Sequence, residues 1–228
     1  MDTDPSDSTS LLDFDQTRVL GCLLEKEMTV PDTYPLTLNS LITACNQSTN
    51  RDPITDFDET TVLHALEHLR MRQWVFMLSQ AGARVPKYRH NCEAKWPDLE
   101  RPERALLCVM MLRGAQTPGE LRLRTERMHT FADVESVEAA LERLMHRHDG
   151  PLVKCLPAGG GRRVATYQHL LSGEVADLPA ASFRAERHAE MIVPPEPSWK
   201  DEVERQLAEL RQEIRDLKSQ LGIAEDGA

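Results

Sequence analysis

The sequence predicts an α+β, mainly α-helical fold of two tandem winged-helix modules followed by a C-terminal heptad helix. Three observations support this prediction. A helical pattern occurs twice, because "VLHALEHL" (residues 62–69) resembles "VEAALERL" (residues 137–144) at an offset of 75 residues. In each copy, two β-prone runs around a turn follow the helices. Apolar residues at alternating spacings of four and three occupy the region near the C-terminus, which is typical of a coiled coil.

Each repeat unit begins with three predicted helices. Apolar residues recur every three or four positions in "QTRVLGCLLEKE" and in "ERALLCVMMLRG", so both stretches are expected to form a first helix. The second helix begins at Thr37 or at Thr117, and in "TPGEL" the threonine, the proline and Glu120 form a capping box with a helix-starting proline. Asp58 and Asp133 are the expected N-caps of the third helices.

A β-hairpin is expected to complete each unit. "WVFMLSQAGARVPKYRHN" and "LVKCLPAGGGRRVATYQHL" each contain two β-prone runs, and glycines mark the turn between them. Three helices and a hairpin are the elements of a winged helix in their usual order. An unrelated helical bundle is the alternative, and the recurrence of the same order disfavours it.

These patterns predict the domain boundaries. Residues 1–14 form an acidic, disordered tail, modules occupy 15–92 and 103–172, and 93–102 form a linker between them. An extended connector is expected over 173–198, the heptad helix over 199–222 and a short disordered tail over 223–228.

The heptad segment favours a homodimer. A parallel pair would bury its a and d residues and would place Glu213 near Lys218 of the other helix. The alternative is that this helix packs onto the body of its own chain. The residues of the seam, which are the dimerisation candidates, are Val203, Leu207, Leu210, Ile214, Leu217 and Leu221.

Charge gives no general support for binding a polyanion. The formal net charge is −10, but the ends hold most of it, with −4 in residues 1–14 and −6 in residues 173–228. The middle is neutral overall, and a neutral module can still carry a local basic patch. No apolar run is long enough to span a membrane, and the N-terminus lacks the features of a signal peptide, so we expect a cytoplasmic protein with no membrane contact.

The sequence contains no motif for a cofactor, a metal or catalysis. Walker A, GxGxxG, HExxH and GxSxG patterns are all absent, so we expect no enzyme activity and no cofactor. His64 and His68 lie one helical turn apart but have no third ligand near them in the sequence, so a solvated face is expected rather than a metal site. The five cysteines are odd in number and form no CxxC pair, which predicts reduced and mostly buried thiols.

Long stretches of the chain resemble a known family. They are "RVLGCLLEKEMTVPDTYPLTLNSLITACNQSTNRDP", "RGAQTPGELR", "DGPLV" and "HLLSGEV". The chain resembles the uncharacterised bacterial YceH-type family over about residues 18–175. The resemblance implies a tandem winged-helix protein and brings no established activity. A basic residue often follows "CNQ" in the family, whereas this chain has Ser48, which weakens a phosphate-binding interpretation of that loop.

The polar stretch "NQSTNRDP" is expected to connect the second and third helices of the first module. Asn46 and Gln47 should satisfy helix-end carbonyls and the backbone of the turn. For this stretch we expect a structural role first, and for Arg51 a contact with a ligand second.

The remaining question is what the modules bind. The third helices begin with acidic residues, Asp58 and Glu59 or Glu135 and Glu138, which phosphates would repel. The hairpins carry arginines and a lysine, which either contact the phosphates of double-stranded DNA or only solubilise the surface. A DNA-binding or regulatory protein and a module that docks a partner protein therefore both stay open. The nucleic-acid-binding candidates are Arg51, Arg84, Lys87, Arg89, Arg162 and Arg163.

Overall fold

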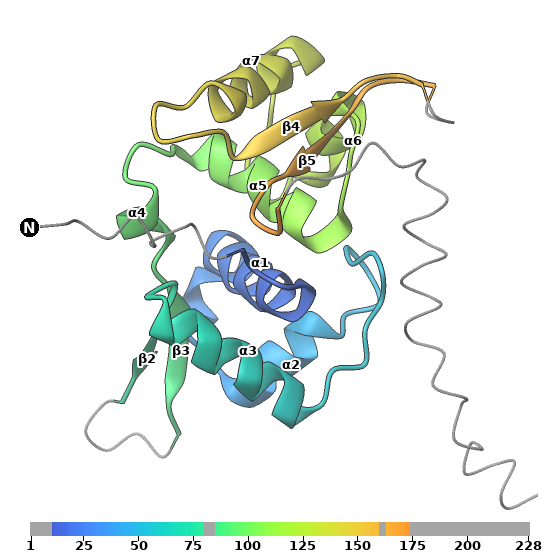
Figure 1. The fold of residues 1–228 in the computed structure, drawn as a ribbon. Coiled ribbons are helices and arrows are strands. Elements are labelled where there is room, and N and C mark those ends of the chain that lie inside the picture. The colour runs from blue at the N-terminus through green and yellow to red at the C-terminus, as the bar shows by residue number, and fades with distance from the viewer. Residues whose placement is uncertain (1–10, 80–84, 160–162, 174–228) are drawn as a thin grey trace, which may run out of the picture. The chain divides into compact units, whose positions relative to one another are not determined.

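Three helices and then an antiparallel hairpin occur twice along the chain (Figure 1). The computed structural model describes residues 11–79, 85–159 and 163–173, all within one compact unit. The first set comprises α1 (Phe14–Thr29), the 3-10 turn η1 (Pro31–Thr33), β1 (Leu36–Thr37), α2 (Leu38–Cys45), α3 (Glu59–Met71), β2 (Val75–Leu78) and β3 (Lys87–His90). The second comprises α5 (Arg101–Arg113), α6 (Pro118–Arg124), α7 (Val134–Met145), β4 (Val153–Leu156) and β5 (Thr166–His169). The predicted α+β, mainly helical architecture is confirmed.

The helices begin at the capping residues that the sequence predicts. The Asp58 and Asp133 carboxylates each accept a hydrogen bond at 2.8 Å from the backbone N–H three residues later. Thr37 accepts in the same way at the start of α2. Thr117 and Glu120 form the expected capping box, with Thr117 N donating to Glu120 Oε2 at 3.0 Å. Local side-chain hydrogen bonds therefore set where these helices begin.

Both hairpins are antiparallel. In the first set the strand order is β1-β3-β2, so β2 lies at an edge of its sheet. Its register pairs Val75 with His90, Phe76 with Arg89, Met77 with Tyr88 and Leu78 with Lys87. In the second set β4 pairs with β5, and Gln116 extends this ladder through two backbone hydrogen bonds with Tyr167, at 3.0 and 2.7 Å.

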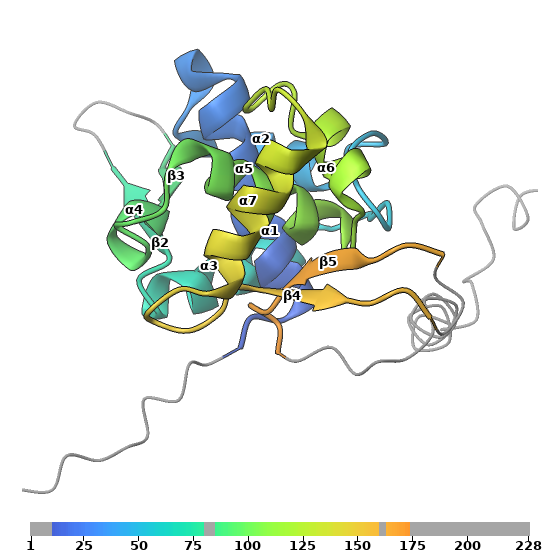
Figure 2. The same cartoon turned by 90° about the horizontal axis from the view of Figure 1, so that it is seen from above.

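One hydrophobic core runs through both sets of elements. Helices α1 and α5 pack against each other in the middle, with α3 on the far side of α1 and α7 on the far side of α5 (Figures 1 and 2). Gly21 permits this close approach, because a Cβ atom there would lie 3.0 Å from Leu112 Cδ2 and 3.1 Å from Met111 Cβ. The Cys108 thiol also donates to the carbonyl oxygen of Gly21 at 3.4 Å. The two halves are therefore joined through their first helices.

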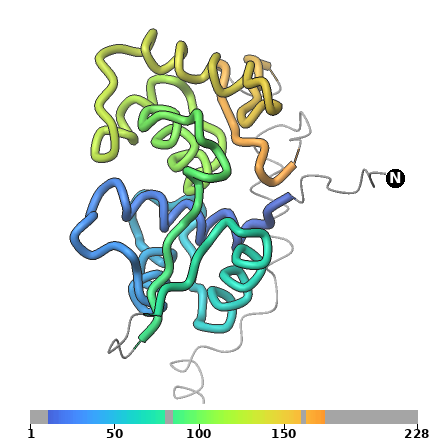
Figure 3. Tube along the Cα trace, turned by 90° about the vertical axis from the view of Figure 1, so that its left-hand side faces the viewer, coloured from blue at the N-terminus to red at the C-terminus, as the bar shows by residue number. Residues whose placement is uncertain are grey.

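The segment expected as a linker is packed into this core. Residues 92–95 form a short helix, α4 (Cys92–Lys95), and α5 begins at Arg101 (Figure 3). Trp96 and Leu99 between them are buried. The ring of Trp96 meets Trp74 edge to face at a centroid distance of 4.9 Å. The stretch between the two sets of elements is therefore part of the folded body.

The body also begins earlier than the sequence indicates. Leu12 is buried and its N–H donates to the carbonyl of Leu171 at 2.8 Å, although the sequence predicts a tail over residues 1–14. Asp13 caps α1 by accepting from Gln16 N at 2.8 Å. The connector and the heptad segment, including all six dimerisation candidates, lie outside the described residues. Within the part that is described, no helix has the length and apolarity needed to cross a membrane.

Candidate nucleic-acid interface

The outer face of the first hairpin brings two of the predicted cations together. Lys87 and Arg89 are both exposed on β3, whereas Tyr88 between them is buried. Their cross-strand partners Leu78 and Phe76 are also exposed, by 37% and 39%. The guanidinium carbon of Arg89 lies 5.6 Å from the centroid of the Phe76 ring, a cation–π contact. This face therefore presents two aligned positive charges beside two apolar side chains.

The inner face of the same hairpin is anchored to α1. His90 Nδ1 accepts from Cys92 N at 3.2 Å, which leaves its Nε2–H to donate to the Glu27 carboxylate at 2.8 Å. The backbone N–H of His90 donates to the Tyr34 hydroxyl, also at 2.8 Å. Burial raises the pKa of Glu27, but the hydrogen bond from His90 and the positive charge of nearby arginines lower that pKa by more. The cations on the opposite face thus project from a fixed strand.

Of the predicted cations, the second hairpin contributes one that the structure describes. Arg163 is exposed just before β5. Arg162 lies outside the described residues, as does Arg84 near the tip of the first hairpin. Lys87, Arg89 and Arg163 are thus the predicted cations that the structure places on the surface.

The third helices present carboxylates to solvent, as expected. Glu59 on α3 and Glu135 and Glu138 on α7 are exposed. Asp58 and Asp133 act as N-caps instead, and the backbone hydrogen bonds of Thr61 and Ser136 lower the pKa of the two aspartates. Positive charge on the described hairpins therefore contrasts with negative charge on the helices that a helix-turn-helix protein would place in the major groove.

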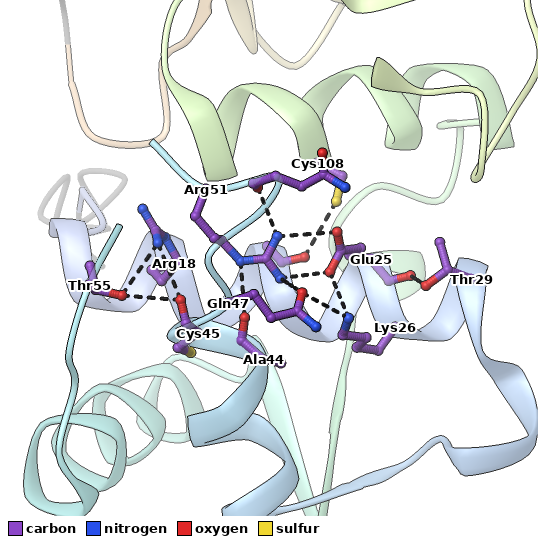
Figure 4. Close-up of polar contacts among 12 residues, drawn as sticks. Arg18, Glu25, Lys26, Thr29, Ala44, Cys45, Gln47, Arg51, Thr55 and Cys108 are labelled. Atoms are coloured by element: carbon purple, nitrogen blue, oxygen red, sulfur yellow. Dashed lines mark hydrogen bonds and ion pairs between the residues drawn. The ribbon is translucent and has the colours of Figure 1, made fainter. Parts of the chain in front are cut away.

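Arg51 has a different position from the other candidates. Its side chain is buried, with 4% exposure, between α1 and the end of α2 (Figure 4). Its Nη2 and Nη1 atoms form a bidentate pair with Glu25, at 2.7 Å to Oε2 and 3.2 Å to Oε1. Its Nε donates to the carbonyl of Ala44 at 3.0 Å, and Nη1 donates to that of Asn50 at 2.8 Å.

Two polar side chains complete the Arg51 cluster, which comprises Glu25, Lys26, Gln47 and Arg51. The Gln47 amide oxygen accepts from Arg51 Nη2 at 3.0 Å and from Lys26 Nζ at 3.1 Å. Lys26 Nζ also lies 3.2 Å from the Glu25 carboxylate. Burial raises the pKa of Glu25, but Arg51 and then Lys26 lower it by more, so Glu25 stays ionised. Burial lowers the pKa of Arg51, whereas its hydrogen bonds to Glu25 raise that pKa by more.

These contacts make Arg51 a structural residue, and we remove it from the proposed nucleic-acid contacts because every guanidinium nitrogen has a protein acceptor. Asn46 has the predicted structural role. Its amide oxygen accepts from Phe57 N at 2.7 Å, and its amide nitrogen donates to the Phe57 carbonyl at 2.8 Å. Gln47 differs from the prediction, since its amide oxygen bonds to side chains rather than to the backbone of the turn.

A second buried arginine supports the same loop. Arg18 of α1 is fully buried, and its Nη2 donates to the Pro53 carbonyl at 2.8 Å. Its Nη1 lies 3.4 Å from the carbonyl of Cys45 and from the Thr55 hydroxyl. The polar stretch after α2 is thus bound to α1 by two arginines. Its Asp52 N–H also donates to the carbonyl of Leu112 in α5, at 3.0 Å.

The described residues contain no group of three or more His, Cys, Asp or Glu side chains that could hold a metal ion. His64 and His68 both lie on the exposed face of α3. All five thiols are free, and only Cys155 is not fully buried.

Comparisons with known proteins identify the family. The family model described as "Protein of unknown function, DUF480" matches residues 12–162. The chain belongs to this DUF480 family. A UPF0502 protein of Vibrio atlanticus is 47% identical over 207 residues, which cover 90% of this chain and 94% of the relative. A UPF0502 protein of Vibrio parahaemolyticus is 44% identical over 215 residues, which cover 90% of this chain and 94% of the relative. A UPF0502 protein of Vibrio cholerae is 48% identical over 177 residues, which cover 76% of this chain and 82% of the relative.

The DUF480 match spans α1 to β4 and therefore includes the first hairpin and the whole Arg51 cluster. Arg163 and β5 lie beyond it. The resemblance to the YceH-type family agrees with membership of the DUF480 family. The description of that family assigns no activity.

Sequence reasoning missed the partner of Arg51. Glu25 lies three residues after the buried Cys22 in α1, within the apolar stripe of that helix. Charged residues are rarely buried without a partner, so a carboxylate at this position was a signal that a buried cation lies nearby. The missing information was which cation the fold would bring to it.

Proposed function

We propose that both halves of the chain are winged helices and that the protein is a non-enzymatic, DNA-binding regulator. The repeated order of three helices and a hairpin supports the winged-helix assignment. In this proposal the hairpins are the wings, and their cations contact phosphates. Such contacts would fix position on a duplex and carry little sequence information.

The outward pair of Lys87 and Arg89 is the observation that carries the proposal. Residues two apart on a strand share a face, so both charges can reach one phosphate backbone. Phe76 lies under Arg89, and Leu78 faces Lys87 across the hairpin, which limits where these side chains point. The carboxylates of α3 and α7 would be repelled by phosphates, so the wings are assigned the main contacts.

A salt-dependent titration of labelled, random-sequence duplex DNA tests this assignment. The Lys87→Ala/Arg89→Ala variant should bind every sequence more weakly. The slope of log K against log salt should flatten by roughly 0.9 for each phosphate that the protein no longer neutralises. Arg70→Ala/Lys95→Ala is the matched control, because it removes two exposed cations outside the strands. If the wing variant retains the full slope, another surface holds the DNA.

A protein partner is the second candidate, and the edge strand β2 favours it. Phe76, Met77 and Leu78 are exposed along this edge, and Met71 at the end of α3 is 69% exposed. An unpaired strand edge with apolar side chains suits the addition of an extended segment of another protein. If the wild type binds no DNA at low salt, this candidate replaces the first. A partner should then co-purify with the wild type but not with Met77→Asp/Leu78→Asp.

A further inference from the structure

A small cavity lies where the two halves meet, and it is separate from the wings. Its volume is about 20 Å³, which is room for one water-sized group. Glu25 and Thr29 line it from α1, and Leu112 lines it from α5. Asn50, in the loop between α2 and α3, also lines it. Residues from two of the stretches that resemble the YceH-type family, "CNQSTNRDP" and "RGAQTPGELR", therefore line the same cavity.

Three arginines converge on this cavity. Arg113 reaches it from the end of α5, Arg124 from the end of α6, and Arg127 from the turn that follows. Among the described residues, neither Arg113 nor Arg127 has a carboxylate within ion-pair distance, and the buried Nε of Arg113 has no acceptor. Arg124 pairs with Glu120 at 3.1 Å. Arg124 is thus the one of these three arginines that has an ion-pair partner among the described residues.

The glutamate in the cavity wall does not cancel this positive charge. Glu25 is already paired with Arg51 at 2.7 Å and lies 3.2 Å from Lys26. The Thr29 hydroxyl donates to the carbonyl of Glu25 at 2.8 Å. Burial lowers the pKa of Arg113, and the positive charges of Arg124 and Arg51 lower it further. Asp52 and Glu120 act in the opposite direction on Arg113, while Arg127 adds a third positive charge beside the cavity.

Asn50 adds an uncharged donor. Its φ of 57° places its backbone in the left-handed region, which asparagine tolerates better than most residues. Its carbonyl oxygen is held by Arg51 Nη1 at 2.8 Å, so the Arg51 cluster fixes the loop that brings Asn50 to the cavity.

We infer that this junction binds a phosphate-sized oxyanion through Arg113, Arg124 and Arg127, with the Asn50 amide as a further donor. One oxygen of the anion would enter the cavity, while the others stay at its mouth beside the exposed Arg127. Guanidinium groups suit this role because their planar donors match the oxygens of a phosphate group. The inference does not depend on DNA binding by the wings. The phosphate group would come from a free anion or from a nucleic-acid backbone.

Titration of the full-length chain with inorganic phosphate, at an ionic strength held constant with sodium chloride, tests the free anion. We expect saturable binding by calorimetry, which Arg113→Gln or Arg127→Gln should weaken by about tenfold. Arg122→Gln is the matched control, because Arg122 lies on helix α6, as Arg124 does, but does not line the cavity. Circular dichroism should show that Arg127→Gln, at an exposed position, stays folded.

A second arm uses random-sequence duplex DNA. If the phosphate group belongs to a nucleic-acid backbone, Arg113→Gln/Arg127→Gln should weaken DNA binding while Lys87 and Arg89 are intact. If it belongs to a free anion, the double variant should bind DNA as the wild type does and fail to bind phosphate. If Lys87→Ala/Arg89→Ala loses DNA binding and Arg113→Gln/Arg127→Gln does not, that result supports the proposed function and does not bear on the cavity. The site is excluded if the double variant changes neither measurement, or if Arg122→Gln weakens phosphate binding as much as Arg127→Gln.

Discussion

The Arg51 guanidinium and the Glu25 carboxylate form a buried, bidentate ion pair, with distances of 2.7 and 3.2 Å. This pair connects the loop after α2 to α1. Both groups are held in their charged forms. Removal of either one would therefore leave the other as a buried charge without its main partner.

Removal of the cation from this pair should be strongly destabilising. We expect Arg51→Met to lower the free energy of unfolding by about 3 kcal/mol, because it leaves the Glu25 carboxylate buried with only Lys26 beside it. The double variant Arg51→Met/Glu25→Leu should recover most of that loss, since no unpaired charge remains. Urea denaturation measures both. A single variant that costs less than the double variant would contradict the argument.

The same pair should make stability depend on pH in the acid range. The pKa of Glu25 is lowered from its ordinary value of 4.5, so its stabilising contribution is present above that value and is lost as the pH falls through the folded-state pKa. The difference in unfolding free energy between the wild type and Glu25→Gln should therefore shrink as the pH is lowered below about 4.5. Denaturation curves at neutral and acid pH provide the comparison. A gap that stays constant would show that Glu25 is not the titrating group.

Gly21 should resist substitution because of its contact with α5. Gly21→Ala should cost about 1–2 kcal/mol, since crowding against Leu112 and Met111 exceeds the gain in helix propensity. Gly119→Ala in α6 is the control, because nothing lies within 4 Å of a Cβ atom at that position. The control should be neutral or slightly stabilising in thermal denaturation. Equal effects of the two substitutions would rule out the packing explanation.

Asn46 should stabilise the loop through Phe57. Asn46→Ala removes a donor and an acceptor that pair with the Phe57 backbone, and we expect a loss of about 2 kcal/mol in unfolding free energy. Asn39→Ala, at an exposed position of α2, should change stability by less than about 0.5 kcal/mol. If both substitutions have the same small effect in urea, the hydrogen bonds to Phe57 do not support the loop.

Local features of this fold were predictable from the sequence, and tertiary features were not. The caps at Asp58, Thr117 and Asp133 depend on residues three positions apart, so the pattern alone locates those helix starts. The alternation in β3 likewise places Lys87 and Arg89 on one face.

The burial of Arg51 and Trp96 depends on which helices meet, and repeat spacing contains no such information. The cavity with Arg113 and Arg127 was missed for the same reason. Its residues come from segments that are distant in the sequence and meet only when α1 packs on α5.

The shared core between α1 and α5 also bears on how the molecule loses its structure. In a long repeat array, stability is roughly a sum of contributions from the units and from the interfaces between neighbours, so parts of the array can unfold separately. Here α1 packs on α5 of the other half as well as on α2 and α3 of its own half, so a melted second half would leave part of its apolar surface in water. The two halves should therefore behave as one cooperative foldon, with slow amide exchange in α1 and α5 arising from the same global opening. The sequence pattern is therefore repeated in the two halves, but neither half is expected to be stable without the other.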